Sequence, residues 1–494
     1  MPSNKIQALK RCPTGVRKLS ALRKWRQGDT HVKTTPGSDN YPEYKPANSR
    51  RDFLKLAAFA CSMPLLPSAG FASIFSEERT AWYRNAKFGM FIHWGPYSLA
   101  SVEASWPIMR PTPGGITEAE YVELPKRFNP EKFDASALVD LARSAGQQYM
   151  VFTTKHHDGF CMFDSSYTNY KITNTPYGKD IVQQLSSACK EAAMPLGFYY
   201  SPPDMHHPAF RDTSKLASTN WNGEPMRPEW PLYLEYMQLQ LTELLTKYGP
   251  VVLVWFDGLN NQQKYDGQRF IELIRHLQPA TLVNDRIGVP GDYVTPEQFI
   301  PTGIPTKDVH FNAVDTSINQ KLKSAVPKPD EFQLWETCMT INNQWAYNAN
   351  DRDFKSAQSL IRGLVEVASR GGNFLLNVGP RPDGTIQPEF QERLRTIGDW
   401  LSVNGDSIYG TSYGPVQGMV SLRTTAKDNK IFVHVFDSPS SALEISGIKP
   451  KVISARLLAT GQSLKFTQVE EKLKLELPSR MPDANVTTMA LMTS

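Results

Sequence analysis

The segment VVLVWFDG, residues 251–258, ends an apolar run on a carboxylate, Asp257. Four aliphatic and two aromatic residues in succession predict a strand buried on both faces, as in a parallel sheet. A buried carboxylate costs free energy unless it is paired or hydrogen-bonded. Asp257 therefore either caps the loop that follows or does chemistry at the mouth of a barrel, where strand ends carry catalytic groups.

Side chains that bind polyols follow six of the predicted strands. They are His93 with Trp94, His156 with His157 and Asp158, Tyr199 with Tyr200 and Asp204, Trp255 with Asp257, Asn284 with Asp285 and Arg286, and Trp335 with Glu336. A single one of them could be a satisfied polar residue of the core, but six strands with this feature indicate one shared site. Neutral histidines, tyrosine hydroxyls and an arginine supply hydrogen bonds, and tryptophans supply apolar faces. The pattern favours a sugar site.

The same residues could instead hold a metal ion, because imidazole and carboxylate groups bind zinc. However, His156 and His157 are adjacent, whereas helical zinc motifs place two ligands four positions apart. No HxH pair ends a strand, and no CxxC pair occurs. A GxSxG match, GTSYG from Gly410, lacks the preceding strand and following helix that a nucleophilic serine needs. We therefore predict no metal, no cofactor and no catalytic serine.

Strand-like and helix-like segments alternate through residues 77–408. The strand candidates are KFGMFIHWG from Lys87, QYMVFTTKHHDG from Gln148, PLGFYYSPPD from Pro195, VVLVWFDG, ATLVNDRIG from Ala280, FQLWETCMT from Phe332 and GGNFLLNVGP from Gly371. The helix candidates are 132–145, 180–193, 231–248, 267–277, 353–369 and a closing helix over 388–404. This alternation predicts an α/β fold, a (β/α)8-like barrel that an eighth strand would close. The rival, a doubly wound sheet, lacks a glycine-rich phosphate loop after any strand.

Residues 409–494 have a different texture, with short alternating segments such as IFVHVF and KLKLELP separated by turn residues. We expect a small antiparallel β-sandwich there. The preceding extension, residues 1–76, contains NSRRDFLKLAAFA from Asn48, which resembles the twin-arginine export signal around Arg50 and Arg51. It predicts a periplasmic or secreted protein.

Charge and cysteine usage differ between the N-terminal extension and the rest of the chain. Residues 1–55 hold 13 basic and 4 acidic side chains, which leaves 41 basic and 45 acidic ones in the remainder. The folded part therefore has no basic surplus that would suggest nucleic acid as a partner. No later apolar run reaches the length of a membrane span. Cys12 and Cys61 fall in the extension, and Cys161, Cys189 and Cys338 are expected to be buried thiols rather than bridges.

Six motifs together resemble family 29 of the glycoside hydrolases, the α-L-fucosidases. They are FGMFIHWGPYSL, TTKHHDGFCMFDS, LGFYYSPPD, VWFDG, VNDR and GGNFLLNVGP, in the family's order between about Trp82 and Ile408. The resemblance implies an irregular barrel followed by a β-sandwich. It also implies retaining hydrolysis of terminal α-L-fucosyl residues of glycans, through a covalent intermediate and without a metal.

The resemblance also assigns roles to residues of this sequence. Asp257 falls on the family's nucleophile, and Arg286 falls on an arginine that reaches into the same pocket. The residues implied to hold the sugar are His93, His156, His157 and Tyr200, with Trp255 beside it. Many relatives carry a Glu-Trp pair after the first strand. Here the nearest match is Ser105-Trp106, so Trp106 is expected to keep its role while the carboxylate is lost.

The second catalytic carboxylate has two candidates. A retaining glycosidase needs an acid/base opposite the nucleophile, with its pKa raised enough to donate a proton near neutrality. Glu297 is favoured by its spacing from Arg286, and Glu336 is the alternative, which could also be a pocket-lining acceptor. Two other functions stay open at this point, an exo-glycosidase for a similar sugar such as an α-galactoside and a non-catalytic sugar-binding protein.

Overall fold

The computed structural model describes residues 69–224, 227–258, 262–308, 326–437 and 441–494. The twin-arginine segment, Cys12 and Cys61 lie outside these ranges. Within them, Cys161, Cys189 and Cys338 are buried free thiols, as predicted. None of the helices in the described part of the chain is both long enough and apolar enough to cross a membrane.

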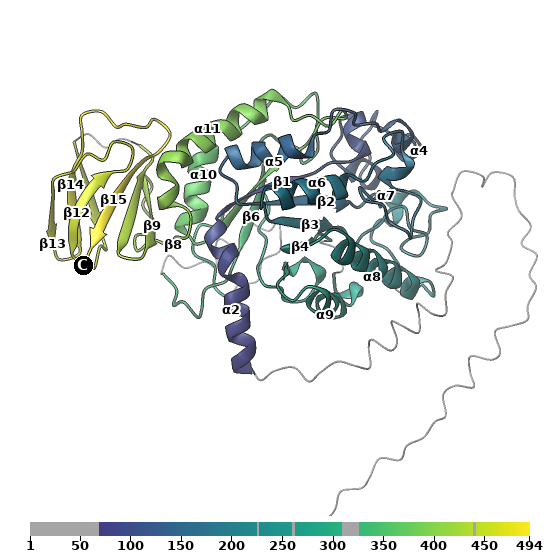
Figure 1. Ribbon diagram of the computed structural model, residues 1–494, viewed down its shortest axis with the longest axis horizontal. Coiled ribbons are helices and arrows are strands. Elements are labelled where there is room, and N and C mark those ends of the chain that lie inside the picture. Colours follow the sequence, from purple (N-terminus) through teal and green to yellow (C-terminus); the bar gives the residue numbers. More distant parts are fainter. Residues whose placement is uncertain (1–68, 225–226, 259–261, 309–325, 438–440) are drawn as a thin grey trace, which may run out of the picture. The chain divides into compact units, whose positions relative to one another are not determined.

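Seven parallel strands form the central sheet, in the order β5-β4-β3-β2-β1-β7-β6 (Figure 1). They are β1 Phe88–Ile92, β2 Tyr149–Lys155, β3 Leu196–Tyr200, β4 Leu253–Phe256, β5 Leu282–Val283, β6 Glu336–Thr340 and β7 Asn373–Val378. Each lies inside one of the predicted strand segments. Nearly all their residues are buried, because the barrel interior covers one face of the sheet and helices cover the other.

The helices that cover the sheet match the predicted helices closely. They are α5 Ala135–Ser144, α6 Ile181–Glu191, α8 Trp230–Lys247, α9 Gly267–Leu277, α10 Ala357–Ser369 and α11 Pro388–Asn404. Several begin at side chains that accept a hydrogen bond from a first-turn N–H, namely Asp134, Asp180 and Ser356. An additional helix, α2 Ala69–Ala86, precedes β1 and crosses residue 77, the expected start of the barrel domain.

An irregular segment, residues 292–298, closes the sheet between β5 and β6. On one side the N–H of Asp292 donates to a carbonyl of β5 (2.7 Å), and on the other the N–H of Gln298 donates to a carbonyl of β6 (2.9 Å). Isolated parallel bridges link the same segment to both neighbours. This segment takes the place of the eighth strand that a barrel requires, and it carries Glu297.

Side chains alternate between the barrel interior and the helix-covered exterior along each strand, as the pleat requires. Phe91, Tyr199 and Trp255 belong to the interior cluster, whereas Tyr200 and Phe256 belong to the larger core around it. Strands β3 and β4 pair Tyr199 with Trp255 and Tyr200 with Phe256. The two strands therefore present the same parity to the barrel interior.

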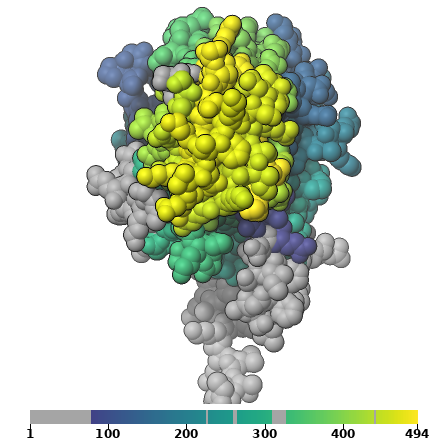
Figure 2. Space-filling model, turned by 90° about the vertical axis from the view of Figure 1, so that its left-hand side faces the viewer, coloured from purple at the N-terminus to yellow at the C-terminus, as the bar shows by residue number. Residues whose placement is uncertain are grey.

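The C-terminal residues form the expected β-sandwich, with one sheet in the order β12-β15-β10-β9-β8 and another in the order β11-β14-β13. The strands are β8 Ser412–Tyr413, β9 Leu422–Lys427, β10 Lys430–Val435, β11 Ala442–Ser446, β12 Val452–Leu457, β13 Phe466–Val469, β14 Lys472–Glu476 and β15 Thr487–Thr493. Their apolar residues form a separate core. Figure 2 views the molecule from this side, with the sandwich in yellow. Glu366 of α10 pairs with Arg423 of β9 and ties the sandwich to the barrel domain.

Candidate active site

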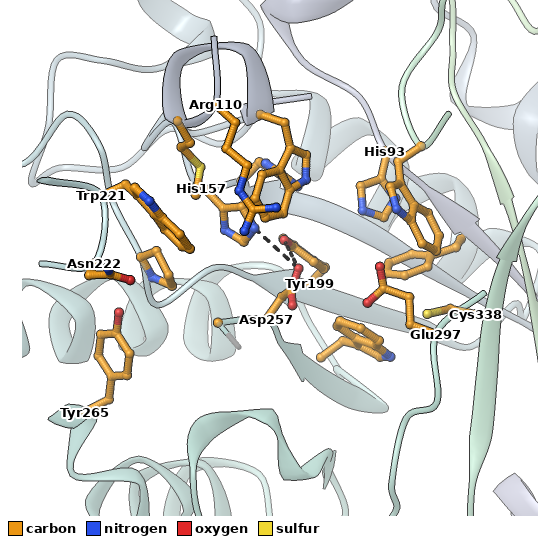
Figure 3. A pocket seen from close by; sticks show the side chains of 18 residues that line it. His93, Arg110, His157, Tyr199, Trp221, Asn222, Asp257, Tyr265, Glu297 and Cys338 are labelled. Carbon is orange, nitrogen blue, oxygen red and sulfur yellow. Dashed lines mark hydrogen bonds and ion pairs between the residues drawn. The ribbon is translucent and has the colours of Figure 1, made fainter. Parts of the chain in front are cut away.

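A pocket of about 220 Å³ opens at the carboxyl ends of the barrel strands (Figure 3). Its lining residues are Phe91, His93, Trp106, Met109, Arg110, His156, His157, Tyr199, Pro203, Trp221, Asn222, Trp255, Asp257, Gly258, Tyr265, Glu297, Cys338 and Trp345. Seven of the ten predicted site residues are among them, and Tyr200, Arg286 and Glu336 are not.

Asp257 is held in place by the strand that precedes it. The side-chain amide of Asn284 accepts from the Phe256 N–H (2.9 Å) and donates to the Phe256 carbonyl (2.9 Å). This pair of bonds extends the pairing of β4 with β5 by one residue beyond the end of the strand. The backbone next to Asp257 is therefore fixed, and the carboxylate projects into the pocket (Figure 3).

The Asp257 carboxylate is surrounded by groups that favour its charged form. Its Oδ2 accepts from the Tyr199 hydroxyl (2.8 Å), and its Oδ1 accepts from Arg286 Nη1 (3.0 Å). His157 Nε2 lies 3.6 Å from Oδ2. Burial alone raises the pKa of Asp257, but Arg286, His157 and the Tyr199 hydroxyl together outweigh burial and hold this pKa below its ordinary value. Asp257 is therefore ionised at neutral pH and suited to act as a nucleophile.

Glu297 lies opposite Asp257 on the same arginine. Its Oε2 accepts from Arg286 Nη1 at 2.7 Å, the nitrogen that also donates to Asp257. Because both oxygens lie within hydrogen-bond distance of one nitrogen, they are less than about 6 Å apart, close to the separation of a retaining pair. Burial raises the pKa of Glu297, Arg286 opposes this effect, and the charge of Asp257 reinforces it, with a net increase. The pKa values of the two carboxyls are thus shifted in opposite directions, as an acid and a nucleophile require.

Arg286 does not line the pocket, yet it joins the two carboxylates. Its Nε donates to Thr295 Oγ1 (2.7 Å), and its Nη2 donates to the Thr295 carbonyl (2.8 Å). The guanidinium carbon lies 4.4 Å from the centre of the Trp255 ring. Because its donors and its ring face are engaged in this way, the buried cation is a rigid clamp for Asp257 and Glu297 rather than a mobile sugar ligand.

Three buried histidines of the pocket share one arrangement, with Nδ1 engaged by a polar side chain. The pairs are His93 with Asn377 Oδ1 (2.7 Å), His156 with Ser105 Oγ (2.6 Å) and His157 with Ser201 Oγ (2.6 Å). Burial lowers the pKa of all three, to about 4 for His93 and His157. They are therefore neutral at pH 7, and the Nε2 atoms remain available to exchange hydrogen bonds with hydroxyl groups.

Among the described residues, one group of side chains has the spacing of a metal site. It consists of His156, His157 and Asp257, and its ligand atoms lie within 4.8 Å of one another. The charge distribution disfavours a cation there. Arg286 already places a positive charge 3.0 Å from Asp257, and a divalent ion at that carboxylate would be repelled by it. The arrangement suits a neutral, hydroxyl-rich ligand better.

Known proteins match both the sequence and the fold. The family model described as alpha-L-fucosidase matches residues 68–406. The alpha-L-fucosidase of Dictyostelium discoideum is 30% identical over 397 residues, which cover 75% of this chain and 81% of that protein. The chain belongs to the α-L-fucosidase family.

Solved structures of this family superpose on the chain. Alpha-L-fucosidase isoenzyme 1 from Paenibacillus thiaminolyticus has a TM-score of 0.74 and 33% identity, and the match covers 85% of this chain and 100% of that chain. A covalent intermediate of the family 29 α-L-fucosidase of Bacteroides thetaiotaomicron, trapped with 2-fluoro-fucosyl fluoride, has a TM-score of 0.71 and 26% identity, covering 84% and 96%.

The structure corrects the assignment of Tyr200 that the family motif implied. Its hydroxyl donates to Gln240 Oε1 (2.8 Å) of α8, on the outer side of the sheet. Tyr199 is the tyrosine that lines the pocket and donates to Asp257. The physical reason is strand parity, since Tyr199 pairs with inward-facing Trp255 across β3 and β4. The sequence alone does not fix this register, because it does not show which tyrosine of β3 pairs with Trp255.

Glu336 also differs from its expected place. It is the first residue of β6, so it lies at the amino end of a parallel strand, away from the mouth where catalytic groups gather. Its carboxylate accepts from Trp255 Nε1 (2.9 Å) and from the Tyr149 hydroxyl. Burial raises its pKa to about 7. Glu336 thus supports the Trp255 ring inside the barrel, and it neither lines the pocket nor occupies the position of an acid/base.

Ser105, where the family resemblance implied a glutamate, is buried and does not line the pocket. Its hydroxyl contacts His156 Nδ1 (2.6 Å) and accepts from the Asp158 N–H (2.8 Å). It therefore orients a histidine and does not itself line the pocket. Trp106, the first residue of helix α3 Trp106–Met109, does line the pocket, with its ring 5.8 Å from that of His157.

Trp345 is a pocket wall that the sequence motifs did not predict. Its ring lies 5.0 Å from that of His93. Its N–H donates to both oxygens of Glu103 (3.0 and 2.9 Å), and its carbonyl accepts from Asn377 Nδ2 (2.7 Å), the residue that also holds His93. The signal for it in the sequence was a tryptophan soon after a barrel strand, at the end where site residues gather.

The reassignment of the tyrosines predicts a difference between two matched variants. Tyr199→Phe removes a hydrogen bond to a charged group, and we expect kcat/KM to fall about tenfold. The pKa of Asp257 should rise, so the acidic limb of the pH profile should move to higher pH. Tyr200→Phe should lower the free energy of unfolding by about 1 kcal/mol and leave kcat/KM near its original value. Steady-state kinetics across pH would contradict the reassignment if Tyr200→Phe showed the larger loss.

Proposed function

We propose that the protein is a retaining exo-α-L-fucosidase, with Asp257 as nucleophile and Glu297 as acid/base. The observation that carries the proposal is the single Arg286 nitrogen shared by the two carboxylates. The positive charge of Arg286 keeps Asp257 ionised. Because the same nitrogen contacts both carboxylates, their separation is short, as in a retaining pair. The covalent intermediate trapped in the Bacteroides enzyme adds support from a relative.

In this mechanism Asp257 attacks the anomeric carbon as the bond to the leaving oxygen breaks, and Glu297 gives that oxygen its proton. Glu297, now ionised, then takes a proton from water, whose oxygen attacks the same carbon and releases Asp257. The two inversions give net retention. Arg286 contacts both carboxylates, so it stabilises whichever of them carries the charge at each step.

Shape and polarity favour a 6-deoxy sugar over an α-galactoside. Phe91, Trp255 and Trp345 form an apolar wall of the pocket, which suits a methyl group better than a hydroxymethyl group. The neutral histidines supply hydrogen bonds for the ring hydroxyls. A pocket of this size accepts one terminal sugar, consistent with removal of fucose from the end of a glycan.

The decisive experiment is hydrolysis of a panel of 4-nitrophenyl glycosides by the purified protein. We expect release of nitrophenol from the α-L-fucoside, at least about 100-fold slower release from the α-D-galactoside, and full activity in EDTA. Faster hydrolysis of the galactoside than of the fucoside would show that the substrate is an α-galactoside instead of an α-L-fucoside. No hydrolysis with retained fucose binding would indicate a sugar-binding protein. Loss in EDTA that is reversed by a divalent ion would show that a metal is required.

We also propose export by the twin-arginine route, to the periplasm or beyond. The support is the motif SRRDFLK, which contains Arg50 and Arg51 and lies outside the described residues. Replacement of both arginines by lysine is expected to leave folded, active protein in the cytoplasmic fraction. Unchanged export of this variant in a fractionation assay would contradict the route.

A further inference from the structure

The pocket continues outward from the proposed reacting centre along a row of aromatic rings. His157 lies 3.6 Å from Asp257. The Trp106 ring lies 5.8 Å from the His157 ring, and the Trp221 ring lies 6.3 Å from the Trp106 ring. Both tryptophans line the same pocket as the catalytic carboxylates. A substrate whose fucose contacts Asp257 would therefore place its leaving group against these two rings.

One cation of this outer region has no anionic partner among the described residues. Arg110 is exposed, and its guanidinium carbon lies 4.8 Å from the Trp106 ring centre and 5.4 Å from that of Trp221. No carboxylate of the described chain forms an ion pair with it. The charges of Asp257 and Arg286 offset each other at 3.0 Å. Glu297 also pairs with Arg286, at 2.7 Å, so neither of these pocket carboxylates is paired with Arg110.

A buried hydroxyl faces the same space without a described partner. Tyr265 has no exposed surface, yet its side chain lines the pocket and its hydroxyl makes no hydrogen bond to any described residue. In Figure 3 Tyr265 and Arg110 enter from opposite sides and both point into the pocket. An unpaired buried hydroxyl costs free energy that a ligand oxygen would recover. The packing of the Tyr265 ring against Trp230, 5.8 Å away, keeps this hydroxyl in place.

We propose that Trp106, Trp221, Arg110 and Tyr265 form a subsite for the leaving group, and that it selects a sugar bearing an anionic group. The aromatic faces stack on the sugar ring, Arg110 pairs with a carboxylate or sulfate ester, and Tyr265 donates to a ring or acid oxygen. The natural substrate is then a fucosylated acidic glycan. This inference rests on the proposed fucosidase activity and adds the class of the group that carries the fucose.

The test compares leaving groups that differ in charge at one position. The probes are 4-carboxyphenyl, 4-sulfophenyl and 4-carbamoylphenyl α-L-fucosides, each with an aromatic ring that fits the tryptophan pair. We measure kcat/KM for each and take the ratio of an anionic probe to the neutral carbamoyl probe. Partial misfolding lowers kcat/KM for both probes equally, so it does not change their ratio within one enzyme preparation. Differences in the intrinsic reactivity of the leaving groups are the same for every enzyme, so they cancel when the ratios of two enzymes are compared.

The variants are Arg110→Gln, Arg110→Lys and a control, Arg127→Gln, which changes an exposed arginine outside the pocket. We expect Arg110→Gln to lower the anionic-to-neutral ratio about tenfold at low ionic strength. Arg110→Lys should retain part of the preference, and Arg127→Gln should retain all of it. High salt should reduce the preference of the unchanged protein. The larger of the two anionic ratios distinguishes a carboxylated from a sulfated sugar.

Two results would overturn the inference. One is an Arg110→Gln ratio equal to that of the unchanged protein, and the other is an equal loss in Arg127→Gln. Hydrolysis of 4-nitrophenyl α-L-fucoside separates this failure from failure of the proposed function. An enzyme that cleaves that substrate but shows no Arg110-dependent preference is a fucosidase without the acidic subsite. A protein that cleaves none of the fucosides contradicts both proposals.

Discussion

Asp257→Gly is expected to lower turnover of every α-L-fucoside by about 10⁴-fold or more, because no other described group of the pocket is placed to attack the anomeric carbon. The cavity left by the missing carboxylate should admit a small anion. Added azide should restore part of the rate with an aryl fucoside and should yield the β-fucosyl azide, in which the configuration is inverted. Product analysis by NMR measures this outcome.

The same experiment has a matched control in Asp158, a second carboxylate from the site region that does not line the pocket. It accepts from the Tyr121 hydroxyl (2.8 Å) and the Phe160 N–H (3.1 Å). Asp158→Asn should leave an active enzyme that gives no azide product. Substantial turnover by Asp257→Gly without azide would contradict the nucleophile assignment, and so would a rescued product of retained configuration.

Glu297→Ala should behave differently, because a substrate with a good leaving group needs little proton donation. We expect kcat/KM to fall by about 10² to 10⁴-fold for a substrate with a poor leaving group, and much less for 2,4-dinitrophenyl fucoside. The covalent intermediate should accumulate as a burst, and azide should give the α-fucosyl azide of retained configuration. In the unchanged enzyme, activity should decline as pH rises through the elevated pKa of Glu297. That alkaline limb should be absent in the variant.

Glu336→Ala is the comparison that separates the two glutamates. It leaves Trp255 Nε1 without its acceptor inside the barrel, which should lower the melting temperature and raise KM. It should give no azide product, and it should keep the alkaline limb that Glu297 produces. If Glu336→Ala gave the retained azide and Glu297→Ala stayed near the original activity, the two roles would be exchanged.

The position of Ser105 affects which polar groups reach the pocket. Its hydroxyl bonds to His156, so among the described residues this position offers the pocket a hydroxyl behind a histidine in place of the glutamate that the family resemblance implied. Glu103, two residues earlier, anchors the backbone of Trp345 instead. Burial raises the pKa of Glu103 to about 8 and the charge of Glu297 adds to this effect. The two glutamates are therefore electrostatically linked, although they lie on different segments of the chain.

The sequence by itself determined the helices and strands of the barrel and the position of Asp257 at the end of a strand. Every predicted strand and helix of the barrel is present, because each depends on a local pattern, such as the apolar run that ends at Phe256. The placement of Asp257 follows from the same run, since the residue after a buried barrel strand faces the mouth. The adjacent histidines, His156 and His157, follow β2 in the same way.

Strand parity and strand direction needed the tertiary structure. Tyr199 and Tyr200 are chemically alike and adjacent, and the pairing of β3 with β4 decides which faces inward. Glu336 was expected at the end of a strand but begins one, because β6 starts one residue after Trp335. The strand was expected to end near Glu336 but begins there, so this carboxylate lies at the opposite end of the barrel from the one expected.

Long-range pairing determined the rest of the site. The segment that carries Glu297 has no strand pattern, and its backbone is held by hydrogen bonds to β5 and β6 on either side, while Arg286 bonds to Thr295 within it. Arg286 then brings Glu297 to Asp257, 40 positions earlier in the chain. Local sequence cannot encode such a contact, because it depends on the closure of the whole barrel. The sequence therefore limited the candidate groups for the chemistry, and closure of the sheet decided which of them meet.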